Sequence, residues 1–195
     1  MTDRAPKDIP VLLRGPLVRA FLAGEKTVTR RTDLNKWRKA KPGDRIWFKE
    51  TWARVPVTAF RMSAGVEQIT DPNDPDMCSI YRAGWERSVS WKWRPSIFMP
   101  KWAARCWAVI EDIREERLQD ITGSQIRAEG AVLRGHDDWV LGYCPVSVFD
   151  EKLYPDLISL WVAGWDSING SKPGLAWADN PTVARIQFRR IGVPA

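Results

Sequence analysis

Apolar residues recur along the chain at two spacings, and each spacing predicts a kind of secondary structure. In residues 17–24, LVRAFLAG, they recur at helical spacing. Pro16 fits the first turn of this helix, and Gly24 fits its C-terminal end. Residues 148–168 carry a stronger repeat and predict an amphipathic helix. Its apolar positions are Leu153, Leu157, Leu160, Trp161, Gly164, Trp165 and Ile168.

Strands are predicted where β-branched and aromatic residues gather or alternate with polar residues. These stretches are residues 9–13, 45–52 (after a turn at 42–44), 79–83, 107–118 and 182–192. In the last stretch Ala184, Ile186 and Phe188 alternate with mostly polar residues, so we expect a half-buried strand.

A short helix is predicted within residues 120–131, DITGSQIRAEGA. Asp120 or Thr122 would cap its start, and Gly130 would end it. Strands interrupted by short helices imply the α+β class, most simply a small barrel. The chain of 195 residues fits one domain, residues 1–195.

Charge and aromatic content narrow the class of partner. The net charge is +6, which favours anionic partners such as nucleotides or RNA. The 12 tryptophans include four within 18 residues, and indole rings both fill cores and stack on nucleobases. We expect most of them to pack the core and one or two to line a ligand pocket.

The sequence contains little evidence for a metal site or for a membrane-spanning segment. The three cysteines, Cys78, Cys106 and Cys144, form no CxxC pair, and His136 is the single histidine. We therefore expect no metal site and no cofactor. No apolar run approaches the 18 residues of a membrane helix, and residues 1–10 lack a signal-peptide core. A cytoplasmic protein without membrane contact is expected.

Residues 24–31, GEKTVTRR, place an amine, two hydroxyls and two guanidinium groups just after the first helix. Together with KPGDRIWFKETW, ERLQDITGSQIRAEG and VARIQFRR, this stretch resembles the ASCH domain of the PUA-like superfamily. Within that family the chain is similar to the small bacterial N4-acetylcytidine amidohydrolases. The resemblance implies a small mixed β-barrel flanked by short helices. It leaves residues 55–105 and 134–175 as insertions.

The family carries a Gly-x-Lys-Thr-x-Thr loop and a later glutamate in a short helix. By position these motifs fall on Lys26, Thr29 and Glu129. The resemblance implies that the three residues form a Thr-Lys-Glu catalytic set. Family members also include suspected RNA binders and a ribonuclease, so the domain alone does not fix the reaction.

Hydrolysis of an acylated cytosine amine needs a nucleophile, a proton for the leaving nitrogen and stabilisation of an oxyanion. Lys26 would activate Thr29 for attack on the acyl carbon, and Glu129 would pass the proton. Direct attack by water is the competing route. As a base, Lys26 needs a pKa well below about 10.4; burial would lower its pKa, whereas an ionised Glu129 would raise it.

Other residues are candidates for substrate contact. Arg30 and Arg31 follow residues 24–29, the lysine loop. Glu50, Tyr81 and Arg82 lie on or near predicted strands. An aromatic and basic segment could cover the site as a lid or simply pack on the barrel. Its residues are Trp93, Arg94 and Met99.

The reading favoured by the sequence is a hydrolase of N4-acylated cytosine or cytidine, which takes a small modified nucleoside as substrate. Two alternatives remain: an RNA-binding ASCH module, with salt-dependent affinity, and a metal-independent ribonuclease. The insertions would give a reshaped pocket and room for bulkier acyl groups.

Overall fold

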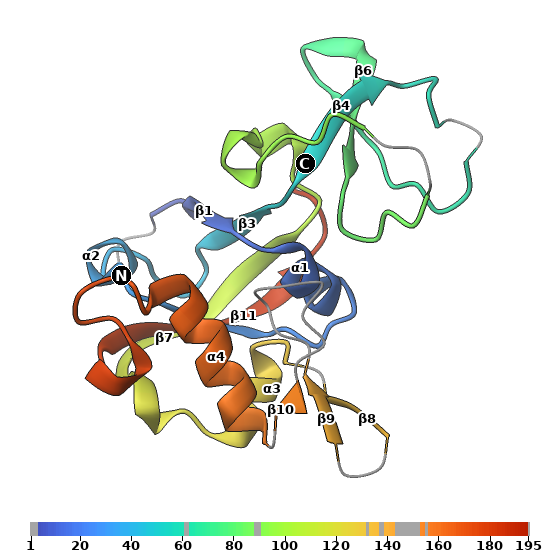
Figure 1. Cartoon of the computed structure of the whole chain (residues 1–195). Helices are drawn as coiled ribbons and strands as arrows, with labels where there is room; N and C mark the ends of the chain where they lie inside the picture. The colour runs from blue at the N-terminus through green and yellow to red at the C-terminus, as the bar shows by residue number, and fades with distance from the viewer. Residues whose placement is uncertain are drawn as a thin grey trace.

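The computed structural model describes residues 4–60, 63–87, 91–131, 133–136, 139–142, 153–154 and 156–194. Within them the chain is a mixed α+β protein, as predicted, with three β-sheets (Figure 1). Cys144 and the side chain of His136 lie outside this description.

The largest sheet has five strands and carries the main core. Its order is β1 (Asp8–Leu12), β3 (Arg45–Lys49), β7 (Trp107–Arg117), β11 (Thr182–Ile191) and β2 (Val28–Arg31). β1 and β3 run parallel, and the other neighbours are antiparallel. Phe21, Phe48 and Phe188 meet in the core of this sheet, with ring centroids 4.9–6.0 Å apart.

The expected closed barrel is not formed by hydrogen bonding among the described strands, since β1 and β2 are the two edges of the sheet. Side chains from β2 and from α2 (Leu34–Trp37) reach the edge of β1 instead. Arg31 donates to the carbonyl of Leu12 at 3.0 Å, and Lys36 donates to the carbonyl of Pro10 at 2.7 Å. Long cationic side chains thereby satisfy edge carbonyls that no neighbouring strand reaches.

The last strand, β11, is more buried than its alternation predicted. It lies between β7 and β2, and both Val183 and Ile186 are fully buried. Ile186 packs in the main core, whereas Val183 packs on the opposite face with the helical layer that contains Trp161. The prediction of a half-buried strand was therefore wrong. Both faces of this strand are covered, and its second face packs against a helix that the alternation pattern does not reveal.

Four α-helices surround the large sheet: α1 (Gly15–Leu22), α2 (Leu34–Trp37), α3 (Gly123–Ala128) and α4 (Leu157–Asn169). Thr122 caps α3 through a capping box with Gln125, as the sequence predicted for one of its two candidates. Asp156 caps α4, which starts later than the predicted helix. Leu153 belongs to a short strand instead. The 3-10 helices are η1 (Ser96–Phe98), η2 (Lys101–Ala103), η3 (Leu118–Asp120) and η4 (Trp177–Asp179).

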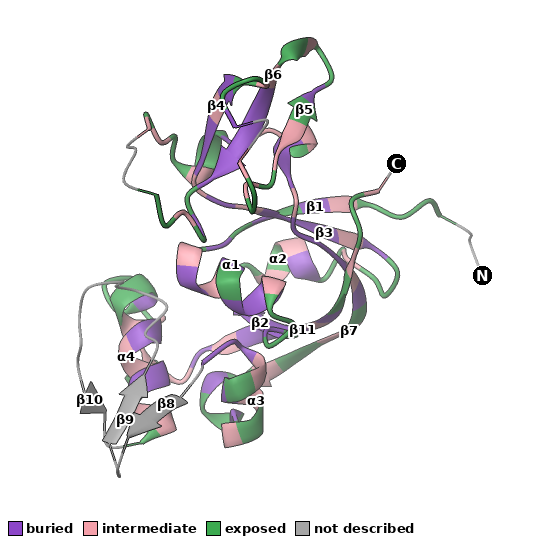
Figure 2. Cartoon of the chain, turned by 90° about the vertical axis from the view of Figure 1, so that its right-hand side faces the viewer, coloured by how far each residue is buried: buried purple, intermediate pink, exposed green. Residues whose placement is uncertain are grey.

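Residues 55–105, predicted as an insertion, contribute most of a separate lobe (Figures 1 and 2). Its sheet consists of β4 (Trp52–Pro56), β6 (Asp74–Tyr81) and β5 (Ile69–Asp71). A cluster around Phe60 and Cys78 forms its own small core. A third sheet, of β8 (Leu133–His136), β9 (Trp139–Gly142) and β10 (Leu153–Tyr154), lies near α4.

Candidate active site

A pocket of about 230 Å³ lies along the free edge of β2. Because β2 pairs only with β11 among the described strands, residues from both of its faces reach the pocket. Lys26, Thr29 and Glu129 all line it, although Glu129 is about a hundred residues away in sequence. Arg30 and Arg31 line it as well. The volume is near the lower end of small-molecule sites, which start at about 300 Å³.

The local fold brings Lys26 and Glu129 together. Helix α1 ends at Leu22, and Gly24, two residues later, has a positive φ of 79° and turns the chain back toward α3. The backbone N–H of Thr27 then donates to the carbonyl of Ala128 at 2.8 Å. From there the chain enters β2 at Val28, so residues 28–31 form a strand and not the loop that the sequence suggested.

The amine of Lys26 is buried, with 2% of the residue exposed. Its Nζ donates to the carbonyls of Val28 (2.7 Å) and Glu129 (2.8 Å) and to Oε2 of Glu129 (3.2 Å). Three acceptors satisfy the three donors of an ammonium. Burial nevertheless lowers the pKa of Lys26, and it outweighs the opposing effect of Glu129. This side chain therefore releases its proton more readily than a surface lysine.

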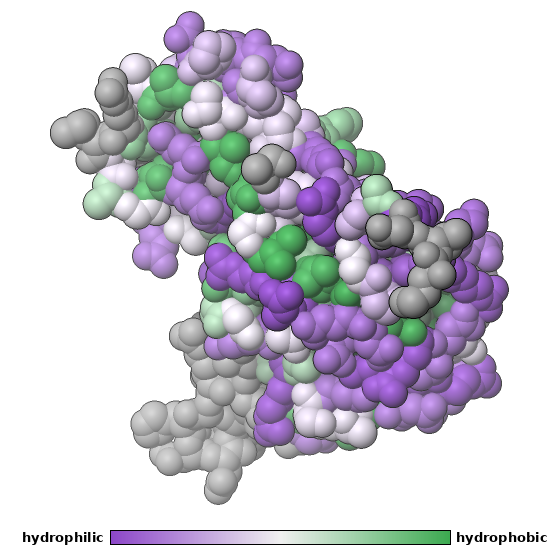
Figure 3. All heavy atoms as spheres, turned by 180° about the vertical axis from the view of Figure 1, so that it is seen from behind, coloured by the Kyte–Doolittle hydropathy of each residue, from purple (hydrophilic) through white to green (hydrophobic). Residues whose placement is uncertain are grey.

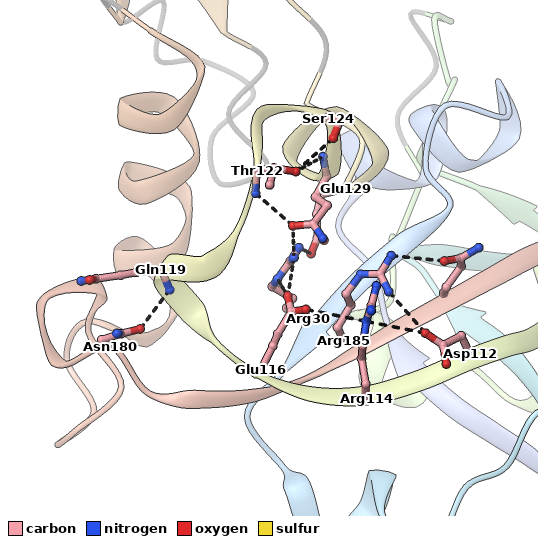
Figure 4. Close-up of polar contacts among 12 residues, drawn as sticks. Arg30, Asp112, Arg114, Glu116, Gln119, Thr122, Ser124, Glu129, Asn180 and Arg185 are labelled. Atoms are coloured by element: carbon pink, nitrogen blue, oxygen red, sulfur yellow. Dashed lines mark hydrogen bonds and ion pairs between the residues drawn. The ribbon is translucent and has the colours of Figure 1, made fainter.

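The carboxylate of Glu129 lies between two cations. Its Oε1 accepts from Arg30 at 3.0 Å (Figure 4), and its Oε2 accepts from Lys26 at 3.2 Å. Arg30 is itself held by Glu116 and by Gln125, the second member of the α3 capping box. The cap of α3, the glutamate at its end and strand β2 thus form one connected polar network. Glu116 and Gln125 were not predicted, because their role depends on where α3 packs.

The two strand neighbours of Arg30 point the other way. Thr29 pairs with Ile186 and Arg31 pairs with Ala184, and both partners belong to the main core. Arg30 pairs with Arg185 on the opposite face. Thr29 is buried, and its hydroxyl makes no hydrogen bond with Lys26 or with any other residue that the structure describes. The hydroxyl is therefore uncommitted.

Helix α4 forms the opposite wall of the pocket. Its contribution is largely apolar and aromatic, from Leu160, Trp161, Gly164, Trp165 and Ile168, with Asn169 and Lys172 at one end. The rings of Trp161 and Trp165 stack with centroids 5.4 Å apart. The sequence predicted this helix but assigned it to an insertion. Two tryptophans on one helix face were the available signal for a wall that could pack against a ring.

Five other predicted contact residues do not line this pocket. Glu50 is buried in an ion pair with Arg105, and the Tyr81 hydroxyl donates to the carbonyl of Ala103. Arg82 lies over the ring of Trp93, and Arg94 lies over the ring of Trp52 in the second lobe.

Met99 is also buried. Of the two possibilities for its segment, a lid or an element packed on the protein, the structure shows the second. Tyr81 and Met99 belong to the cluster where the two lobes meet. This role depends on tertiary contacts, so the sequence alone could not show it.

The described residues show neither a metal centre nor a membrane-spanning helix. Among the described residues no group of three His, Cys, Asp or Glu side chains is placed to hold a metal ion. No helix in that part of the chain has the length and apolar character needed to cross a membrane. Comparison with known protein families, characterised proteins and solved structures finds no match to this chain.

Proposed function

We propose that the protein is an ASCH-type amidohydrolase that removes acyl groups from N4 of cytosine or cytidine. The observation that carries the proposal is that Lys26, Thr29 and Glu129 line one pocket, opposite a wall of tryptophans. A planar base fits against such a wall, since indole rings stack on nucleobases. The amine, hydroxyl and carboxylate would then face the acylated nitrogen.

The contacts of Lys26 suggest how protons move. Nζ of Lys26 lies 3.2 Å from Oε2 of Glu129, so a proton can pass from the ammonium to the carboxylate. The neutral amine then takes the proton of the Thr29 hydroxyl as Oγ1 attacks the acyl carbon. For this step Lys26 must turn from its present acceptors toward Thr29.

The attack forms a tetrahedral oxyanion. When it collapses, the bond from carbon to N4 breaks, and Glu129 returns a proton to the leaving nitrogen. Water hydrolyses the acyl-threonine and releases the carboxylic acid. The competing route, direct attack by water, uses the same groups without the acyl-threonine. Mass spectrometry of the protein quenched with a slow substrate separates the two routes, because only the first leaves an acyl adduct on Thr29.

An ultraviolet assay with N4-acetylcytidine tests the function itself. We expect turnover by the wild type and a loss of about a hundredfold or more in kcat for Thr29→Val, Lys26→Met and Glu129→Gln. These variants keep the size of each side chain. Glu25→Gln is the matched control, because Glu25 is an exposed carboxylate beside Lys26. Absence of turnover of N4-acetyl and N4-benzoyl cytidine by the wild type would refute the proposal.

The same preparation tests the two alternatives that the basic charge suggests. An RNA-binding module would bind RNA with an affinity that falls steeply with salt and would hydrolyse no acylated nucleoside. A ribonuclease would cleave RNA in the presence of a metal chelator. Either result without amide hydrolysis would replace the proposed function.

A further inference from the structure

The two adjacent arginines of β2 have different surroundings. Every nitrogen of the Arg30 guanidinium donates a hydrogen bond, to Glu116, to Glu129 and to Gln125. Arg31 makes one hydrogen bond, to the carbonyl of Leu12. Its Nε is buried and has no partner among the described residues. The two side chains leave opposite faces of the strand, and within the ranges that the structure describes the Glu129 carboxylate accepts from Arg30 and Lys26 rather than from Arg31.

Among the described residues that line the pocket, cations outnumber acids. These cations are Lys26, Arg30, Arg31 and Lys172, and the described acid is Glu129. Lys26 and Arg30 both have that acid within 4.0 Å, whereas Arg31 has no carboxylate at that distance in the described part of the chain. Within the described ranges, Lys172 bonds the amide oxygen of Asn169, at 3.3 Å.

Burial also lowers the pKa of Arg31, and this effect outweighs the opposing attraction of Glu129. A partly buried cation of this kind is stabilised by an anion, and a guanidinium suits the paired oxygens of a phosphate. The pocket that Arg31 lines is where such an anion can approach. Lys172 and Asn169 lie across the same pocket, at the end of α4.

We propose that Arg31 forms an anion subsite of this pocket, and that the protein acts on nucleotides that carry a phosphate in preference to free nucleosides. The inference rests on the proposed function in one respect, namely that the cytosine ring lies against the tryptophans of α4. The phosphate then lies between the end of β2 and the end of α4. Arg31 binds the ligand and Arg30 positions Glu129.

Binding of the products tests the subsite without any need for turnover. In calorimetry at low salt, cytidine 5′-monophosphate binds the wild type about tenfold or more tightly than cytidine, as expected for one charge-assisted phosphate contact. Arg31→Gln reduces this ratio to about twofold. Arg31→Lys retains part of it, because the charge remains and the fork is lost.

Arg189→Gln is the matched control, since it removes the same charge from an exposed part of β11 that does not line the pocket. It keeps the full ratio. Circular dichroism verifies that each variant is folded. Equal affinity of the wild type for the two products, or a ratio that survives in Arg31→Gln, overturns the subsite.

Turnover then separates this inference from the proposed function. Hydrolysis of N4-acetylcytidine without preference for its monophosphate leaves the function standing and removes the subsite. A preference for cytidine monophosphate that depends on Arg31, with no hydrolysis of any N4-acylated compound, leaves the subsite standing and removes the function.

Discussion

Gly130 is the residue at which α3 touches the lysine loop. It has a positive φ of 90°, and a Cβ atom there would lie 2.9 Å from Cβ of Ala20 and 3.2 Å from Cβ of Lys26. Glycine is therefore needed twice, for its backbone conformation and for the close approach. The sequence predicted its place at the end of the helix, but the contact with Lys26 depends on packing and is invisible in the sequence.

Gly130→Ala should destabilise the protein by about 3 kcal/mol, from left-handed strain and overpacking together. Gly174→Ala is the control, because Gly174 has a similar φ of 71° with nothing within 4 Å of the added methyl group. We expect a loss of about 1 kcal/mol there. Urea denaturation measures both, and equal losses would contradict the close packing of Gly130 on the loop.

The pH profile reports on Lys26. In the proposed route Lys26 supplies the proton that Glu129 passes to the leaving nitrogen, so kcat/KM falls at high pH along a limb whose midpoint lies below 10.5, the ordinary value for lysine. Arg31 is one of the charges that lower this pKa, so Arg31→Gln should move the limb to higher pH. Arg189→Gln should leave it in place. A shift to lower pH would exclude Lys26 as the titrating group.

Stability has a linked dependence on pH. Because the pKa of Lys26 is lower in the folded than in the unfolded chain, the unfolded chain binds more protons between the two values. The contribution of Lys26 to stability therefore rises with pH across that window, up to about 10.5. It is unfavourable at neutral pH, as expected for a buried amine.

At the scale of elements, α4 shows the limit of sequence reasoning most clearly. The apolar repeat predicted the helix, yet the repeat says nothing about which surface the helix covers. In the structure Trp161 and Trp165 pack in the hydrophobic cluster that contains Val183, and together with Leu160 they also form the wall of the pocket. Strand β2 is the reverse case: the sequence singled out its residues as site candidates, but predicted a loop where the structure has a strand.

Trp161→Phe should weaken binding of cytidine monophosphate several-fold and change kcat little, because the smaller ring offers less area for stacking. Trp177 provides the matched control. Its ring packs edge-on against Trp161 at 5.8 Å but does not line the pocket. Trp177→Phe should leave the affinity unchanged. Equal effects of the two variants would show that the base does not lie on α4.

At the scale of the whole molecule, two lobes meet at an aromatic junction formed by Trp47, Trp52, Tyr81, Met99 and Trp107. Seen from behind, hydrophobic residues also show at the narrowing between the lobes, on a face that is otherwise largely hydrophilic (Figure 3). Residues 55–105, which the family resemblance left as an insertion, lie mostly in the second lobe. The buried ion pair of Glu50 and Arg105 could not be predicted, because the two residues lie 55 residues apart.

Glu50 accepts two hydrogen bonds from Arg105, at 2.8 and 2.9 Å, and is 1% exposed. Glu50→Ala leaves a buried guanidinium without its main partner, so we expect a loss of about 3–5 kcal/mol. Glu67 bonds the same arginine at 2.8 Å, but half of its side chain is exposed. Glu67→Ala should cost about 1 kcal/mol or less. Thermal and urea denaturation of the two variants should therefore differ widely.

The position of β11 near the C-terminal end of the sequence determines when the pocket can fold during synthesis. Strand β2 finds its only strand partner, among those described, in residues 184–187. The lysine loop and Thr29 therefore have no fixed place while a ribosome is still making the preceding 180 or so residues. We expect the nascent chain to bind no ligand until β11 emerges. The pocket is then completed in a single late step, after both lobes have been synthesised.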